Sequence, residues 1–220
     1  MTSPHILYED GHVIVAVKPA GIESQSSKDG SDMIAILSAH TGTQIYPVHR
    51  LDRGTEGITV YAKTQSAAAS LSDAFASGAT DKTYLAVLCG VPSEAEGTYE
   101  DLLYHDKTKN KSYVVDRKRA GVKRASLSYK TITSEDGLTL VRVKLHTGRT
   151  HQIRVQFASR KTPLLGDTRY GGTPHPSVAK GAFALAAVSL SFPHPSKKEK
   201  MTFSIIPSGE VWKSFPTEAN

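Results

Sequence analysis

Residues 49–62 have the sequence HRLDRGTEGITVYA, in which a polar loop leads into an apolar segment. Residues 57–62 are apolar and β-branched, a pattern typical of a buried strand. The loop places Asp52 between Arg50 and Arg53. Nearby cations keep a carboxylate ionised, and an ionised carboxylate can act as a nucleophile or a base. The arginines can also hold phosphates, but a surface cluster of ion pairs would have the same sequence, so the loop alone leaves both interpretations open.

Outward from this stretch, hydrophobic periodicity predicts further elements. The additional strands are expected at residues 6–8, 13–17, 82–88, 127–133, 138–146, 183–192 and 201–206. The helices are expected from Ser31 or Asp32 to Leu37, at 66–76 before Gly78, at 151–159 with Thr150 as the cap, and at 210–215. Strands outnumber helices and often follow one another as hairpins. The sequence therefore predicts an α+β fold with a mostly antiparallel mixed sheet and flanking helices, formed by one domain over residues 1–220.

Composition narrows the class of protein. Hydrophobic residues make up 39% of the chain, which is enough for a packed core. The one cysteine, Cys89, rules out an intrachain disulfide and fits a reducing cytoplasm. No apolar run reaches the ~18 residues of a membrane helix, and residues 1–9 lack the features of a signal peptide. We therefore expect a cytoplasmic protein with no membrane association.

The net charge is +6, and the positive excess lies in one segment. Residues 105–124 contain eight basic and two acidic residues, whereas the rest of the chain contains 19 of each and is neutral. A local excess of this kind suggests a phosphate-backbone partner. A solvated loop that aids solubility would have the same composition. Because the segment lies between predicted strands, we expect it to form a protruding loop.

Two further segments carry functional groups. Residues 148–154, GRTHQIR, stand at a predicted strand end and helix start, where free N–H groups favour anions and Arg149 and Arg154 add positive charge. Tyr84 stands in the predicted strand at 82–88, where its ring can stack on a flat base. Each segment also has a plainer interpretation: the arginines can decorate a solvated helix face, and Tyr84 can be an ordinary strand aromatic.

Several common sites are missing from the sequence. The nine histidines include no pair at HExxH spacing, and one cysteine cannot form a thiolate zinc cage, so we expect no metal. The Gly-x-Ser-x-Gly, P-loop and Gly-x-Gly-x-x-Gly patterns are absent, so we expect no nucleotide cofactor. We expect His49 and His151 to be structural hydrogen-bonding residues rather than catalysts.

Together these segments resemble the RluA-type family of RNA pseudouridine synthases, in its compact form without an S4 domain. The resemblance extends over residues 6–207, and five motifs in the same order make it specific. The matching segments are 7–10 (LYED) and 18–21 (KPAG), 49–52 (HRLD) with Thr55, Gly57 and 62–63 (AK), 82–86 (KTYLA), 148–154 (GRTHQIR) with 166–167 (GD) and 170–171 (YG), and 190–192 (LSF) with 194–195 (HP).

This resemblance implies a pseudouridine synthase-like fold and the isomerisation of uridine to pseudouridine in RNA without a cofactor. It implies that Asp52 attacks the sugar or assists removal of its proton, that Tyr84 stacks on the detached uracil, and that Arg154 pairs with Asp52. Arg50 would occupy the position that the extruded uridine leaves. Further RNA-binding residues are expected to be Arg53, Arg149, His151, Lys118, Arg119, Lys123 and Arg124.

Two positions depart from the family pattern. The usual Thr-Ser-Gly is Thr55-Glu56-Gly57 here, and the usual Leu-His-Ala is Leu185-Ala186-Ala187. Neither change removes the nucleophile, so they bear on the substrate more than on the chemistry. The expected RNA partner is transfer RNA, large-subunit (23S-type) ribosomal RNA, or both, and we expect a monomer with no obligate protein partner.

Two other functions compete with this interpretation. The first is a non-catalytic RNA-binding or ribosome-assembly protein of the same fold, although binding alone does not need the set of Asp52, Tyr84 and Arg154. The second is a carboxylate-dependent hydrolase of nucleosides or glycosides, which would normally use two carboxylates. Glu56 is near Asp52 in sequence, but its place at the start of a strand does not ensure that the two carboxylates face each other.

Overall fold

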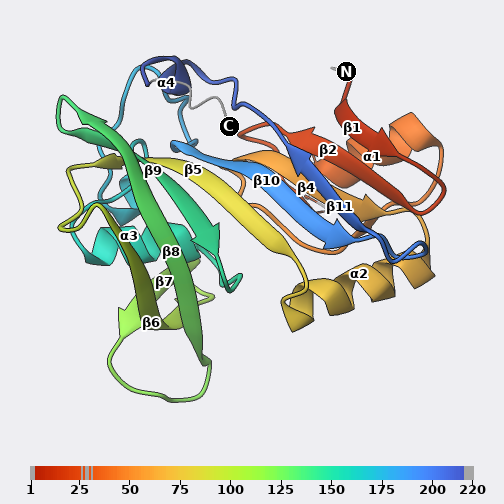
Figure 1. Cartoon of the computed structure of the whole chain (residues 1–220), viewed down its shortest axis with the longest axis horizontal. Helices are drawn as coiled ribbons and strands as arrows, with labels where there is room; N and C mark the ends of the chain where they lie inside the picture. The colour runs from red at the N-terminus through yellow and green to blue at the C-terminus, as the bar shows by residue number, and fades with distance from the viewer. Residues whose placement is uncertain (1–2, 26, 28–29, 31, 216–220) are drawn as a thin grey trace. The chain divides into compact units, whose positions relative to one another are not determined.

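The computed structural model describes residues 3–25, 27, 30 and 32–215 (Figure 1). The chain folds into two compact units. Unit 1 consists of Met1–Lys82 and Ala186–Pro207, and unit 2 consists of Thr83–Leu185 and Ser208–Asn220. The chain therefore leaves unit 1 after Lys82, returns to it at Ala186 and leaves it again after Pro207. That the whole chain forms one domain stays a prediction.

Unit 1 is a sheet with a helix on each face. Its strands β1 (His5–Glu9), β2 (Val13–Lys18), β4 (Glu56–Ala62) and β10 (Leu185–Pro193) lie in that order, while β3 (Tyr46–Pro47) pairs with β4 and β11 (Lys200–Ser204) pairs with β10. All of these pairs are antiparallel except β4 with β10.

The central strands β2 and β4 of this sheet are buried on both faces. One face of β2 and β4 packs with Ala67 and Leu71 of helix α2 (Gln65–Ser77), and the other packs with Met33 and Leu37 of helix α1 (Met33–Thr41). The sandwiched position explains why the sequence of these strands is almost continuously apolar rather than alternating. It also gives the loop before β4 a rigid support.

Local capping residues set the ends of both helices. Thr64 accepts a hydrogen bond from the Ala67 N–H at the start of α2, and Gly78 ends this helix in the left-handed conformation. This confirms the helix predicted at 66–76. Asp32 caps α1 in the same way, while the alternative cap, Ser31, lies outside the described residues.

Unit 2 is an antiparallel sheet covered on one face by a short helix. The strand order is β5 (Asp81–Cys89), β9 (Leu138–Leu145), β8 (Val122–Glu135), β6 (Glu96–Asp106) and β7 (Lys111–Val115). Helix α3 (Gln152–Ser159) packs Phe157 against Tyr99 and Tyr129, with ring centroids 5.3 and 5.4 Å away. A 3-10 turn, η1 (Thr168–Tyr170), and helix α4 (Glu210–Lys213) complete the unit.

The basic segment at 105–124 corrects one expectation. It is not simply a protruding loop, because β7 and the ends of β6 and β8 form most of it, with turns at 107–110 and 116–121. The polar sequence of β6 and β7 hides the strand pattern, since most of their side chains are only half-buried. Ladder hydrogen bonds to β6 therefore hold the strand residues Lys111, Lys123 and Arg124, whereas the other five basic residues lie in the two turns.

The start of α3 corrects a second expectation. The capping position is His151, in the left-handed conformation with φ 55°, and not Thr150. Its side chain makes no capping hydrogen bond; Thr150 instead offers its carbonyl oxygen to the Ser112 hydroxyl at 2.6 Å. The other predicted strands and helices are confirmed within a few residues, and β3, β6 and β7 were not predicted. No helix among the described residues is both long and apolar enough to cross a membrane.

Replacing Gly57 with alanine should strongly destabilise unit 1. A Cβ at this position would lie 2.3 Å from the Ala187 carbonyl oxygen of β10, and the φ of +126° is strained for any side chain. We expect the free energy of unfolding to fall by more than about 3 kcal/mol in urea titrations. Gly11→Ala is the matched control, because a Cβ added at Gly11 would meet nothing within 4 Å. If both changes lowered the free energy of unfolding equally, the Ala187 backbone of β10 would be able to move away from residue 57 at little cost.

Candidate active site

The loop that carries Asp52 connects β3 to β4 in unit 1. Leu51 is buried, with 4% of its surface exposed, whereas Arg50 and Arg53 are exposed and Asp52 is half-buried. The backbone N–H of Thr55 donates to the Asp52 carbonyl oxygen at 3.0 Å and closes a tight turn just before β4. The loop thus buries the apolar side chain next to Asp52 and presents a carboxylate that is flanked in sequence by two cations.

The segment after β2 holds this loop by hydrogen bonds. The buried Ser24 hydroxyl bonds both the N–H and the carbonyl oxygen of Leu51, each at 3.0 Å. The Gly21 N–H donates to the Arg53 carbonyl oxygen at 2.8 Å, and the Arg53 Nε returns a bond to the Gly21 carbonyl oxygen at 2.9 Å. These contacts fix the main chain on both sides of Asp52.

Lys18 lies under the same loop with none of its surface exposed. Its Nζ donates to the carbonyl oxygens of Pro19, Ile22 and Arg53 at 2.9, 2.8 and 3.2 Å, which uses all three of its protons. Burial lowers the pKa of Lys18 to about 8, against the attraction of Glu23, Asp52 and Glu56. The ammonium group is therefore an electrostatic neighbour of Asp52. Sequence analysis placed Lys18 in a motif but assigned it no role; a lysine that ends an apolar strand was the available signal.

His49 holds the other end of the loop. Its Nε2 accepts a hydrogen bond from the Val60 N–H of β4 at 3.0 Å, and its ring stacks on Phe75 of α2 at 4.4 Å. Burial, and after it the charge of Lys82, lower the pKa of His49 to about 3. The imidazole is thus neutral, with its proton on Nδ1. This is the structural role expected for His49.

Arg154 is the most firmly held of the predicted catalytic residues. It is 6% exposed on α3, and its Nε and Nη2 bond both oxygens of the Asp167 carboxylate at 2.6 and 2.9 Å. The guanidinium carbon lies 4.2 Å from the ring centroid of Phe183 and 5.0 Å from that of Tyr170. Asp167 was quoted in a motif but not predicted as a site residue. Whether Arg154 also pairs with Asp52 stays a prediction, because the two residues belong to different units.

The other predicted residues of unit 2 lie near the start of α3 or on the sheet. Tyr84 is buried on β5 opposite Val143 of β9. His151 is buried, and its Nδ1 lies 2.9 Å from the Tyr170 hydroxyl, which supports the structural interpretation. Burial raises the pKa of Tyr170, so its hydroxyl stays protonated. Arg149 is exposed and donates from Nε to the Arg124 carbonyl oxygen at 3.0 Å.

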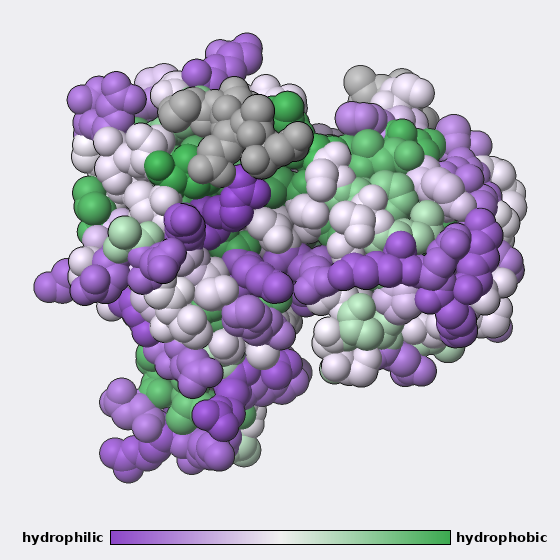
Figure 2. Space-filling view, viewed as in Figure 1, coloured by the Kyte–Doolittle hydropathy of each residue, from purple (hydrophilic) through white to green (hydrophobic). Residues whose placement is uncertain are grey.

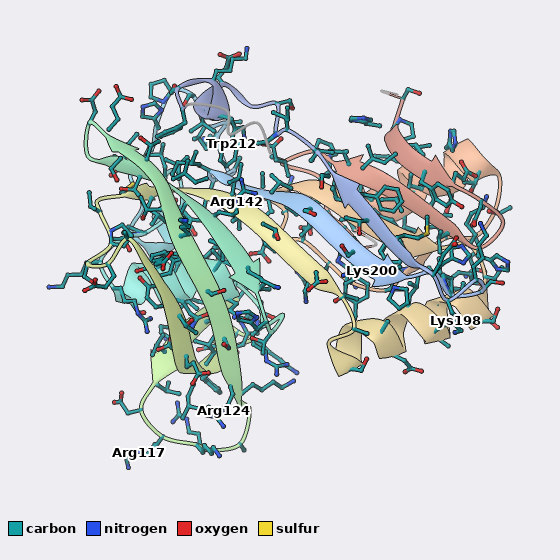
Figure 3. The ribbon with its side chains drawn as sticks, viewed as in Figure 1. Arg117, Arg124, Arg142, Lys198, Lys200 and Trp212 are labelled. Carbon is teal, nitrogen blue, oxygen red and sulfur yellow. The ribbon has the colours of Figure 1, made fainter. Side chains whose placement is uncertain are left out.

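The basic hairpin, residues 105–124, ends in a strongly charged tip. Its exposed basic residues include Lys118, Arg119, Lys123 and Arg124. Figure 3 shows Arg117 and Arg124 at the far end of β8, and Figure 2 shows hydrophilic side chains over this tip. The guanidinium carbon of Arg119 lies 4.9 Å from the Tyr104 ring centroid. No cluster of three or more His, Cys, Asp or Glu among the residues that the structure describes could hold a metal ion.

Comparisons with known proteins identify the family. The model of the RNA pseudouridylate synthase family matches residues 12–159. The chain is 37% identical over 207 residues to the uncharacterized RNA pseudouridine synthase YjbO of Bacillus subtilis, covering 90% of this chain and 70% of that protein. It is 33% identical over 215 residues to the ribosomal large subunit pseudouridine synthase D of Zymomonas mobilis, covering 90% and 67%.

A solved structure of a human protein shares the fold of this chain. The human protein RNA pseudouridylate synthase domain containing 4 superposes with a TM-score of 0.77 at 20% identity, covering 95% of this chain and 90% of that one. The fold and the matched motifs together define an RNA-modifying isomerase. The chain belongs to the RNA pseudouridylate synthase family and is an RNA pseudouridine synthase. The resemblance and the α+β fold expected from the sequence are thereby confirmed.

The buried Lys18 should leave a pH signature in stability. Its pKa is about 8 in the folded chain and near the ordinary 10.5 when unfolded. Between these values the unfolded chain binds more protons, so stability should rise with pH through this interval and not below it. Relative to Lys18→Met, wild type should gain on the order of 3 kcal/mol from pH 8 to 10.5 in urea titrations. A constant difference across this interval would contradict the buried ammonium group.

Proposed function

We propose that this enzyme isomerises specific uridines in transfer RNA, large-subunit ribosomal RNA or both, with Asp52 as its catalytic carboxylate and no cofactor. The observation that carries the proposal is the Asp52 loop, which holds a half-buried carboxylate on a hydrogen-bonded support between two exposed arginines. Likeness to a relative named as a large-subunit synthase favours ribosomal RNA as the first substrate to test. A cytoplasmic monomer remains our prediction.

The reaction needs a mobile base and a fixed catalyst. The bond between uracil N1 and ribose C1′ must break and one between C5 and C1′ must form, while C5 loses a proton and N1 gains one. We infer that the uridine is extruded from the RNA, which costs a few kcal/mol, and that the exposed Arg50 takes its place. Asp52 then attacks the sugar or assists removal of its proton.

Tyr84 and Arg154 are proposed to act as fixed groups around the detached uracil. The detached uracil has to rotate without escaping, so it needs a fixed and dry wall. We propose that Tyr84, which is buried on β5, stacks on the uracil and helps to remove its C5 proton. Arg154 would orient the Asp52 carboxylate, and its own bidentate bond to Asp167 would prevent the guanidinium from turning away.

The basic hairpin is the proposed clamp for the RNA backbone. Its exposed cations include Lys123 and Arg124 on β8 and Lys118 and Arg119 in the turn that joins β7 to β8. Phosphate contacts position RNA without reading its sequence. The cations Lys118, Arg119, Lys123 and Arg124 would therefore contribute affinity, while the target uridine is selected elsewhere.

Asp52→Asn should abolish pseudouridine formation and leave RNA binding largely intact, because the amide keeps the shape of the carboxylate but cannot act as a nucleophile or base. The test incubates unmodified transfer RNA and large-subunit ribosomal RNA with each protein, then maps pseudouridine by carbodiimide modification and primer extension. Asp73→Asn, at an exposed aspartate of α2, is the matched control and should behave as wild type. Turnover by Asp52→Asn would refute the assigned role, and release of free uracil by wild type would favour a hydrolase.

Neutralising Lys118, Arg119 and Arg124 to glutamine should weaken the salt dependence of RNA binding. Each lost phosphate contact removes ~0.7–0.9 from the slope of log affinity against log salt, so we expect a change of about 2. The control replaces three exposed lysines elsewhere in unit 2, Lys161, Lys180 and Lys213, by glutamine. Fluorescence anisotropy titrations at several salt concentrations measure the slope. An unchanged slope in the hairpin variant would mean that the segment only aids solubility.

A further inference from the structure

The sheet of unit 2 has a second face, which α3 does not cover. Side chains alternate between the two faces of a strand. Tyr129, which packs on Phe157 of α3, is paired with Val143 of β9, so these residues share the helix-covered face with Tyr84. The neighbours Arg142 and Lys144 are exposed and therefore lie on the opposite face. This open face is not part of the site described above.

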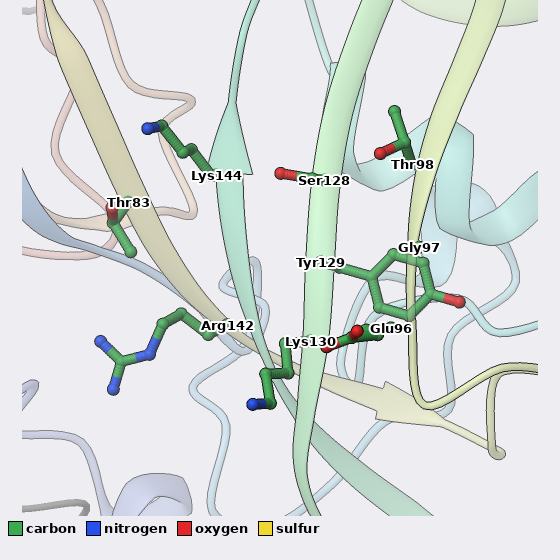
Figure 4. A pocket seen from close by; sticks show the side chains of 9 residues that line it. All are labelled: Thr83, Glu96, Gly97, Thr98, Ser128, Tyr129, Lys130, Arg142 and Lys144. Atoms are coloured by element: carbon green, nitrogen blue, oxygen red, sulfur yellow. The ribbon is translucent and has the colours of Figure 1, made fainter.

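The open face contains a groove with a volume of about 540 Å³ (Figure 4). Strands β5, β6, β8 and β9 all contribute to it, and every lining residue belongs to unit 2. The cations in its wall are Lys130, Arg142 and Lys144, and the single carboxylate is that of Glu96. The groove is therefore open, polar and positively charged.

The strand register arranges these residues in two rows across the sheet. The first row is Glu96, Lys130 and Arg142, and the second is Thr98, Ser128, Lys144 and Thr83. Lys130 and Arg142 are thus directly opposite each other on neighbouring strands, and like charges in this arrangement repel each other. An anion bound over them would interact with both cations.

The second row adds hydroxyl donors around a cation. Ser128 and Thr83 stand directly across from Lys144 on its two sides, and Thr98 stands beyond Ser128. Hydroxyl groups and an ammonium group together match a phosphodiester, whose oxygens accept hydrogen bonds and carry negative charge. Glu96 stands directly opposite Lys130, and with three cations and one carboxylate the lining keeps a formal excess of two positive charges.

The same face is apolar at its other end. There Leu140 and Val87 pack with Val211 and Phe215 of the C-terminal segment, and Leu138 and Trp212 border this cluster. Along β9 the outward side chains therefore change from Leu138 and Leu140 to Arg142 and Lys144. The cations begin where the apolar cover ends, so this part of the face is polar and open to a ligand.

The charge continues along β8 to the basic hairpin. Ala125, Leu127 and Tyr129 are buried, so Arg124, Ser126, Ser128 and Lys130 share the outward face. Lys130 is six positions along the strand from Arg124, a distance of roughly 20 Å. Figure 3 shows Arg142 and Arg124 at separate points of this face. A line of cations of this length fits an extended polyanion better than a small ligand.

We propose that the open face of β5, β9, β8 and β6 is a second RNA-binding surface, which holds a flanking part of the substrate RNA by its phosphates. The proposal rests on the proposed function, since it takes RNA as the substrate. The surface lies on the opposite side of the sheet from Tyr84, so it would grip RNA away from the extruded uridine. It predicts that RNA length contributes to affinity.

The test compares Lys130→Gln/Lys144→Gln with a control of equal charge, Lys161→Gln/Lys180→Gln. Fluorescence anisotropy measures their affinities for unmodified transfer RNA and large-subunit ribosomal RNA transcripts, and for short stem-loops cut from each. The groove variant should bind a long RNA roughly 3- to 10-fold more weakly than wild type, and its salt slope should be lower by about 1.5. Its affinity for the short stem-loops should fall much less. Circular dichroism confirms that both variants are folded.

The outcomes are separable. A selective loss for long RNA supports the surface, even where no pseudouridine is formed and the proposed function therefore fails in the mapping assay. An unchanged affinity for long RNA would overturn the proposal and leave the groove to another anion, such as an acidic protein segment. An equal loss in the control variant would overturn it as well, because the effect would then reflect net charge alone.

Discussion

A single buried ammonium group lies beneath the loop on which the proposed chemistry depends. Lys18 has no exposed surface, and its three protons bond three backbone carbonyl oxygens, one of which belongs to Arg53 beside Asp52. Burying a charge is costly unless it is hydrogen-bonded and close to opposite charge. Asp52 and Glu56 provide part of that opposite charge. The same interaction therefore fixes the main chain of the loop and makes a carboxylate at its centre electrostatically favourable.

Each unit holds the residues of the proposed site in place, but the contacts that do so differ between the two units. In unit 1, His49 joins the Asp52 loop to strand β4 and Ser24 joins it to the segment after β2, so the loop is fixed without becoming part of the sheet. In unit 2, the bidentate bond between Arg154 and Asp167 sets a side chain on a short helix whose first residue has no side-chain cap. Catalytic groups need a fixed geometry, and fixing them costs conformational entropy that packing and hydrogen bonds must offset.

The two positions that depart from the family pattern are neighbours in the sheet of unit 1. Glu56 of β4 and Ala186 of β10 are register partners in the parallel pair. The chain therefore combines a larger, charged residue with a small, apolar one at a single point, so the two departures form one local change. Gly57, directly beside them, has to be glycine because the Ala187 backbone approaches it closely. The two residues are 130 positions apart in the chain, so the sequence alone could not place them together.

The sequence by itself determined the family, the α+β class and most strands and helices, and it predicts Asp52 as the catalytic carboxylate, because these inferences depend on periodicity and on ordered local motifs. It misjudged the basic segment and the cap of α3, where half-buried polar strands show no hydrophobic period and a left-handed histidine replaces a side-chain cap. Only the tertiary structure decided that Lys18 supports the Asp52 loop, that Asp167 holds Arg154, and that Lys130 and Arg142 oppose each other on an open face. These are contacts between residues distant in sequence, and no local pattern encodes which distant partner a side chain will meet.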